Sequence, residues 1–121
     1  MAGRKRKASE SPFAISERAF QYQLEMLLEA NKWVWKHDLK GRLPNGRMMT
    51  LVRGWSGFPD LIAVRDGRVV CIEVKSTIGR LSEKQRIWLE LLEKAGVECY
   101  VWKPADLEEA RRVLQRKRDK K

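Results

Sequence analysis

The hydrophobic residues of this chain recur at helical spacing in three segments. The first covers residues 15–31, where Ser16 can act as the N-cap and one face carries Phe20, Leu24, Leu27 and Leu28. The second covers residues 81–96 and is expected to end at Gly96, with an apolar side made of Leu81, Trp88, Leu89, Leu92 and Ala95. A third helix is predicted to start at Pro104 and to run through residues 105–118, with acids in its first turn and bases in its last.

The remaining apolar runs have the length and composition of β-strands. Residues 32–37 and 47–54 are expected to form a hairpin-like pair with a basic connection. Residues 58–64 and 68–76 flank the turn Arg65-Asp66-Gly67, which predicts neighbouring antiparallel strands, and their continuous apolar character indicates helices on both faces. Residues 97–103 complete a mixed α/β domain with a central sheet, over residues 13–116 between basic tails at 1–12 and 117–121.

The composition of the chain indicates which partner it binds and where it is located. The chain has 121 residues, 35% of them charged, and a formal net charge of +10, which favours nucleic acid as the partner. Cys71 and Cys99 lie among apolar residues and are expected to be core residues rather than a disulfide or metal site. No apolar run is long enough to span a membrane, and the N-terminus lacks the apolar segment of a signal peptide, so a cytoplasmic protein is expected.

The basic residues allow two interpretations. The basic ends of the chain hold much of the excess charge and are consistent with solvated tails. The middle of the chain is also basic, however, with Lys40, Arg42, Arg47, Arg53, Arg80, Lys84 and Arg86.

Polar side chains occupy several positions expected to be buried. Glu17 falls on the apolar side of the first helix, where it is either a first-turn acid that stabilises the helix N-terminus or a site residue. Gln85 falls on the apolar side of the second helix, and Ser82 with Gln85 matches a capping box. Gln85 can therefore be either a helix cap or a site residue.

Glu73 and Lys75 project from one face of an otherwise apolar strand. A solvated salt bridge on an edge strand is one explanation, but the apolar flanks favour a central strand. Asp60 and Glu73 are equally far from the Asp66-Gly67 turn, so antiparallel pairing brings the two acids together. Two close carboxylates repel each other, and a hard divalent cation would relieve that repulsion.

Pro59-Asp60 followed by Glu73-Val74-Lys75 resembles the P-D…(D/E)-x-K signature of restriction-endonuclease-like nucleases. The segments GFPDLIAV, EVKS, LSEKQ and LLEKAG more closely resemble the VRR-NUC family, including phage and bacterial stand-alone nucleases and Holliday-junction-resolvase-like proteins. The resemblance implies a restriction-endonuclease-like central sheet flanked by helices, in the order α-β-β-β-α-β-α. It also implies that Asp60, Glu73, the Val74 carbonyl and Glu17 hold Mg²⁺ or Mn²⁺, that Lys75 orients or deprotonates the attacking water, and that Gln85 lies at the edge of the site.

The function implied is a metal-dependent DNA endonuclease that leaves 5′-phosphate and 3′-hydroxyl ends and prefers branched DNA such as Holliday junctions. A symmetric homodimer would suit the two-fold symmetry of such a junction. A compact stand-alone nuclease of this kind suggests a phage or bacterial source. The alternatives are a non-catalytic nucleic-acid-binding module of the same fold and a basic protein that contacts only a protein partner. Trp55 and Ser56 are expected either to line a DNA groove, with Trp55 stacking on an exposed base, or to fill the core, which is the more frequent place for a tryptophan. The DNA-binding candidates are Lys40, Arg42, Arg47, Arg53, Trp55, Ser56, Arg80 and Lys84.

Overall fold

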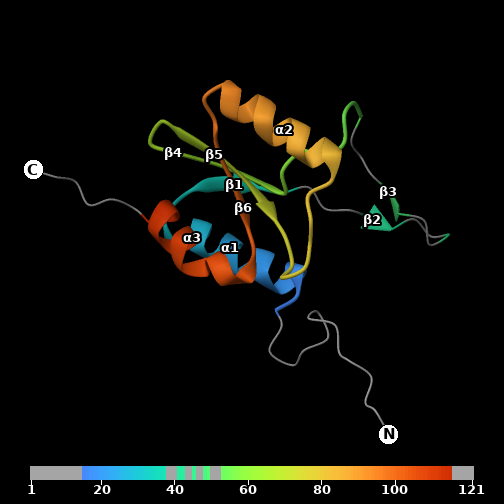
Figure 1. Cartoon of the computed structure of the whole chain (residues 1–121). Helices are drawn as coiled ribbons and strands as arrows, with labels where there is room; N and C mark the ends of the chain where they lie inside the picture. The colour runs from blue at the N-terminus through green and yellow to red at the C-terminus, as the bar shows by residue number, and fades with distance from the viewer. Residues whose placement is uncertain (1–14, 38–40, 43–44, 46–47, 50–52, 116–121) are drawn as a thin grey trace, which may run out of the picture.

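The protein is a mixed α/β domain in which helices cover a central sheet (Figure 1). The computed structural model describes residues 15–37, 41–42, 45, 48–49 and 53–115, so the two tails and the residues Lys40 and Arg47 lie outside the described part of the chain. Its elements are α1 (Glu17–Ala30), β1 (Val34–Lys36), β2 (Gly41–Arg42), β3 (Met48–Met49), β4 (Leu61–Arg65), β5 (Arg68–Val74), α2 (Glu83–Lys94), β6 (Glu98–Trp102) and α3 (Leu107–Leu114). The predicted fold class is confirmed.

The main sheet has four strands in the order β1-β4-β5-β6. β1 and β5 both run antiparallel to β4, and β6 runs parallel to β5 after the crossover through α2. β5 is therefore a central strand, and a solvated edge-strand salt bridge does not explain its Glu73 and Lys75.

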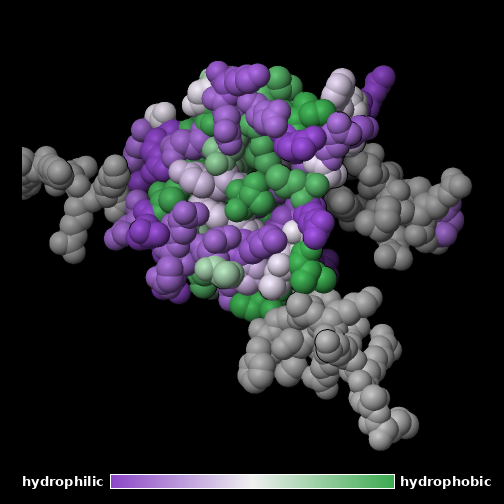
Figure 2. All heavy atoms as spheres, in the orientation of Figure 1, coloured by the Kyte–Doolittle hydropathy of each residue, from purple (hydrophilic) through white to green (hydrophobic). Residues whose placement is uncertain are grey.

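The hydrophobic core lies between the sheet and the pair α1 and α3, while α2 covers the opposite face (Figure 1). Phe20, Leu24 and Leu28 of α1 are fully buried because their spacing places them on one side of the helix. They pack with buried residues of the sheet and of α3, namely Leu61, Ala63, Val70, Ile72, Val74, Trp102, Ala110 and Leu114. Space-filling atoms show apolar residues gathered between α2 and the pair α1 and α3, surrounded by hydrophilic ones (Figure 2).

The predicted hairpin between residues 32–37 and 47–54 is wrong. β1 pairs with β4 through Val34–Val64, Trp35–Ala63 and Lys36–Ile62. In the described part of the second segment, Met48–Met49 is a strand, and it pairs with Gly41–Arg42, which lies in the predicted connection. Both faces of β5 are buried as expected from Val70 to Val74, but Val64 of β4 remains exposed.

Smaller differences concern helix ends and side-chain burial. Pro104–Asp106 forms a short 3-10 turn, and the α-helix begins only at Leu107. Ala95, expected on the apolar side of α2, is exposed, and Cys99 is half-buried whereas Cys71 is buried as expected. Among the described residues, no helix is both long and apolar enough to cross a membrane.

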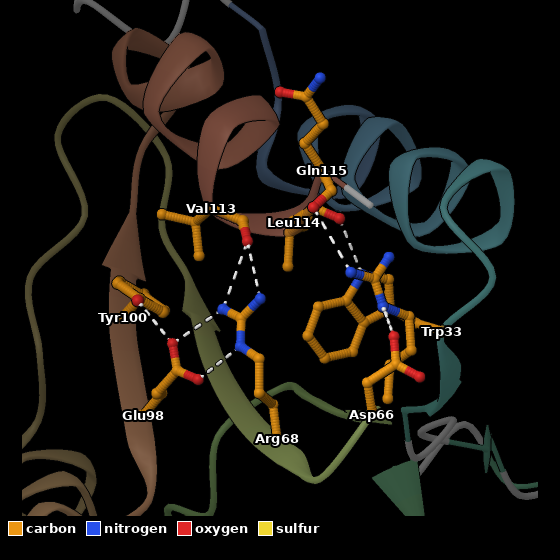
Figure 3. A network of polar contacts seen from close by, with 9 residues as sticks. Trp33, Asp66, Arg68, Glu98, Tyr100, Val113, Leu114 and Gln115 are labelled. Carbon is orange, nitrogen blue, oxygen red and sulfur yellow. Dashed lines mark hydrogen bonds and ion pairs between the residues drawn. The ribbon is translucent and has the colours of Figure 1, made fainter. Parts of the chain in front are cut away.

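A polar network ties the turn between β4 and β5 to the C-terminal end of α3 (Figure 3). Arg68 donates to both carboxylate oxygens of Glu98, at 2.8 and 2.9 Å, and to the carbonyl of Val113. The indole N–H of Trp33 donates to the carbonyl of Leu114 at 2.9 Å, and the guanidinium groups of Arg65 and Arg68 both lie over the Trp33 ring. Arg65 also donates to the carbonyl of Asn31 at 2.7 Å, so the donors of both arginines are engaged within the fold.

Candidate active site

Asp60 and Glu73 meet at the ends of two paired strands. β4 and β5 are antiparallel, and Leu61 lies opposite Ile72. One residue further out in the same register, Asp60 lies opposite Glu73. The Oδ2 atom of Asp60 accepts a hydrogen bond from the backbone N–H of Val74 at 2.8 Å, which fixes the orientation of this carboxylate. The structure therefore brings together the two acids that the sequence predicted as neighbours.

Glu73 is the one polar or charged residue that is buried among the described residues, with 1% of its surface exposed. Its Oε2 atom accepts a hydrogen bond from Nε2 of Gln85 at 3.0 Å and lies 3.4 Å from Nζ of Lys75. Its Oε1 atom is also buried and accepts no hydrogen bond from a donor of the described residues, so a hydrogen bond between this carboxyl group and Asp60 requires a proton on one of the two acids. A buried acceptor without a partner is costly, by about 1–3 kcal/mol even when it is uncharged.

Gln85 connects the cap of α2 to the candidate site. Its Oε1 atom accepts hydrogen bonds from Nζ of Lys75 at 2.8 Å and from the backbone N–H of Ser82 at 2.9 Å. The Ser82 hydroxyl accepts from the backbone N–H of Gln85 in return, which completes the capping box. The two roles considered for Gln85 are therefore compatible, because one amide side chain caps the helix and holds both Lys75 and Glu73.

The environment of Glu73 favours its neutral form. Burial, the hydrogen bond with the Asp60 carboxyl and repulsion by its charge raise the pKa of Glu73 to about 8, although Lys75 opposes the shift. Desolvation disfavours a carboxylate, and a second carboxylate adds to that cost. A cation placed between the two acids would reverse both effects.

The donor set fits a divalent metal ion. The unpartnered Oε1 of Glu73 and the neighbouring Asp60 carboxylate are hard oxygen ligands, which Mg²⁺ and Mn²⁺ prefer. The described residues contain no group of three or more Asp, Glu, His or Cys side chains placed to hold a metal together. Two carboxylates are nevertheless enough for Mg²⁺, which keeps several waters and shares substrate phosphates.

Two further metal ligands, implied by the family resemblance, remain predictions. Glu17 is the first residue of α1, and its side chain is exposed, as expected for an acid at a helix N-terminus. The Val74 residue follows Glu73 on β5 and its N–H contacts Asp60.

Trp88 of α2 holds the loop that leads into Pro59-Asp60, a role that the sequence did not indicate. Its indole N–H lies 3.0 Å from the carbonyl of Ser56 and 3.3 Å from that of Trp55. Its ring meets the Phe58 ring edge-on, with the centroids 5.1 Å apart. A tryptophan on the apolar side of an amphipathic helix is typical of a core residue. The one sequence signal for this contact is that the N–H of a half-buried indole needs a hydrogen-bond acceptor.

Gly57 allows this loop to approach α2 closely. It has a φ of +96°, and a Cβ atom at this position would lie 2.8 Å from the carbonyl carbon of Lys84 and 2.9 Å from the amide nitrogen of Gln85. The same helix therefore contacts the loop before Asp60 and, through Gln85, the pair Glu73 and Lys75.

The DNA-binding candidates are placed unevenly. Arg53, Trp55 and Ser56 lie in this loop and are exposed, and so are Arg80 and Lys84 near the start of α2. The expectation that Trp55 fills the core is wrong, since 66% of its surface is exposed. Arg42 lies in β2, and DNA contact by any of these residues stays a prediction.

Comparisons with known proteins identify relatives of this site. The chain matches the family model of the VRR-NUC domain over residues 38–106, more than half of its length. It is 45% identical to the Fanconi-associated nuclease 1 homolog of Arabidopsis thaliana, in an alignment that covers 46% of this chain and 7% of the plant protein. No solved structure matches the chain.

The close approach at Gly57 can be tested with a matched glycine. Gly54→Ala and Gly57→Ala both introduce a side chain at a φ near +95°, which costs roughly 1–2 kcal/mol. A Cβ atom at Gly54 would meet no atom within 4 Å beyond its chain neighbours, whereas one at Gly57 would meet the α2 backbone. Gly57→Ala should therefore lose a further 1–3 kcal/mol or so in urea unfolding. Equal losses for the two variants would show that the loop is not packed on α2.

The raised pKa of Glu73 predicts how stability depends on pH without metal. The folded protein holds a proton at Glu73 between the ordinary pKa of 4.5 and about 8, whereas the unfolded chain releases it. Stability should therefore fall as the pH rises through this interval, by up to roughly 1.4 kcal/mol per pH unit. Glu73→Gln should remove this contribution, and the comparison requires urea unfolding of both proteins from pH 5 to about 9. Parallel pH profiles for the two proteins would contradict the assignment.

Proposed function

The chain belongs to the VRR-NUC domain family, and we propose that it is a metal-dependent nuclease that hydrolyses DNA phosphodiester bonds. The main support is the buried Glu73 carboxylate, which has one unpartnered oxygen and lies against Asp60 and Lys75. Such an arrangement costs stability, which is typical of a site that is completed by a ligand. The nuclease activity named for the plant relative is consistent with it.

Asp60 and Glu73 would hold Mg²⁺ or Mn²⁺, with the Val74 carbonyl and Glu17 as the further ligands expected from the sequence. When bound, the metal would acidify a water molecule and neutralise charge on the phosphate under attack. The protein supplies fixed oxygen atoms for this purpose, because Val74 N–H orients Asp60 and Gln85 orients Glu73.

Lys75 would act on the phosphate or on the attacking water. Its ammonium group is held by Oε1 of Gln85 at 2.8 Å, and its side chain is 11% exposed, so it is fixed yet reachable from solvent. A positioned cation of this kind stabilises negative charge that develops on the phosphate. Gln85 is then a positioning residue that keeps Lys75 and Glu73 in register.

The exposed basic residues Arg53, in the loop before Asp60, and Arg80 and Lys84, near the start of α2, would contact the DNA backbone without reading its sequence. Selection would therefore depend on DNA structure, and we propose branched DNA such as four-way junctions as the substrate. Endonucleolytic cleavage would leave 5′-phosphate and 3′-hydroxyl ends. A homodimer would match the symmetry of such a junction.

Cleavage of a four-way junction and of a plain duplex tests this proposal. With Mg²⁺ or Mn²⁺, the wild-type protein should cut the junction faster than the duplex, and chelation by EDTA should stop the reaction. Asp60→Asn, Glu73→Gln and Lys75→Ala should each lower the rate by at least about 100-fold, as removal of one electrostatic group from an active site commonly does.

The matched controls are Glu83→Gln and Lys94→Ala, which remove one acid and one base from exposed positions at the two ends of α2. Both should cut at nearly the wild-type rate. Undiminished cleavage by Glu73→Gln would refute the proposed site, and DNA binding without metal-dependent cleavage of either DNA would favour the non-catalytic alternative.

A further inference from the structure

The loop from Arg53 to Phe58 combines a fixed backbone with an exposed indole. The Trp88 N–H holds the carbonyls of Trp55 and Ser56, and Gly57 packs on the backbone of α2. The Trp55 side chain nevertheless remains 66% exposed. This loop is therefore held in place while its largest apolar side chain faces solvent.

The fixed backbone matters for the energetics of binding. A large aromatic group on a mobile loop loses conformational entropy when a ligand orders it, whereas a group whose backbone is already held loses less. The Phe58 ring, packed edge-on against Trp88, adds to this restraint on the other side of Gly57. Trp55 is thus preorganised for a flat apolar ligand.

The loop is also close to the proposed site. Trp55 precedes Asp60 by five residues, a span of at most about 18 Å of extended chain. DNA strands rise by about 3.4 Å per nucleotide, so the backbone of Trp55 lies within roughly five nucleotides of a phosphate at Asp60. Two exposed basic residues lie near this loop. Arg53 belongs to the loop itself, and the backbone of Lys84 packs against Gly57.

From these observations we infer that Trp55 is a stacking platform for an unpaired nucleobase within a few nucleotides of the phosphate that is cut. The inference rests on the proposed nuclease function. Inside a duplex both faces of each base are covered by neighbouring bases, so an indole can stack only on a base at an end, a flap or a junction. Aromatic stacking with neighbouring cations is the usual way in which proteins hold single-stranded nucleic acid. Trp55 would then select DNA that carries an unpaired base within a few nucleotides of the cleavage position.

The test measures binding and so does not depend on cleavage. One DNA is a plain duplex, and the other has the same sequence with a short single-stranded flap and 2-aminopurine as the first unpaired base. In EDTA, the wild-type protein should quench the 2-aminopurine fluorescence and bind the flapped DNA more tightly than the duplex. Trp55→Ala should abolish the quenching and weaken binding of the flapped DNA by about 10-fold or more, with duplex affinity unchanged.

Two variants make the result specific. Trp55→Phe keeps an aromatic face and should retain most of the quenching. Tyr22→Ala removes an aromatic side chain of similar exposure, 63%, from α1, and should behave as the wild type. Urea unfolding should show nearly equal stability for Trp55→Ala and wild type, because the lost side chain is exposed.

The inference is overturned if Trp55→Ala binds both DNA forms as the wild type does, or weakens both equally. Failure of the nuclease proposal looks different, because the quenching and the preference for flapped DNA would persist while no DNA is cut with Mg²⁺ or Mn²⁺.

Discussion

The constraint on which the site depends is the burial of Glu73 with half of its carboxylate unsatisfied. One oxygen accepts a hydrogen bond from Gln85 and lies near Lys75, and the other accepts none from any donor in the described part of the chain. A central strand, covered by α1 and α3 on one face and by α2 on the other, keeps water away from this group. The cost is acceptable only if something favours the ionised form during function, and the second acid beside it, Asp60, makes a divalent cation the natural candidate.

Helix α2 organises the rest of the site. Through Gln85 it holds Lys75 and Glu73 on β5, and through Trp88 and the close contact at Gly57 it holds the loop that enters β4 at Asp60. Both halves of the site, and the proposed platform at Trp55, are therefore fixed to one rigid element. This explains why the start of α2 carries both a complete capping box and the contacts to the site.

Local sequence signals predicted the parts of this account that depend on short-range geometry. The turn after Arg65 set the register that places Asp60 opposite Glu73, and the Ser82–Gln85 spacing predicted the cap of α2. The partner of β1 was not predictable in this way, because a three-residue strand with an exposed Val34 carries no pattern that distinguishes β4 from another strand. Two features depend on tertiary packing and could not be predicted from the sequence. They are the hydrogen bonds of Trp88 to carbonyls more than 30 residues away and the buried Oε1 atom of Glu73 that accepts no hydrogen bond among the described residues.

The most direct test of the central claim is a calorimetric titration of the protein with Mn²⁺ at pH 7, repeated in buffers of different ionisation enthalpy. If Glu73 is a protonated ligand awaiting a cation, the wild-type protein should bind Mn²⁺ and release protons as it does so. Glu73→Gln should not bind at the same concentrations, while Glu83→Gln should bind as the wild type does. Binding of equal affinity by Glu73→Gln, or no binding by the wild type, would contradict the claim that the buried carboxylate is a metal ligand.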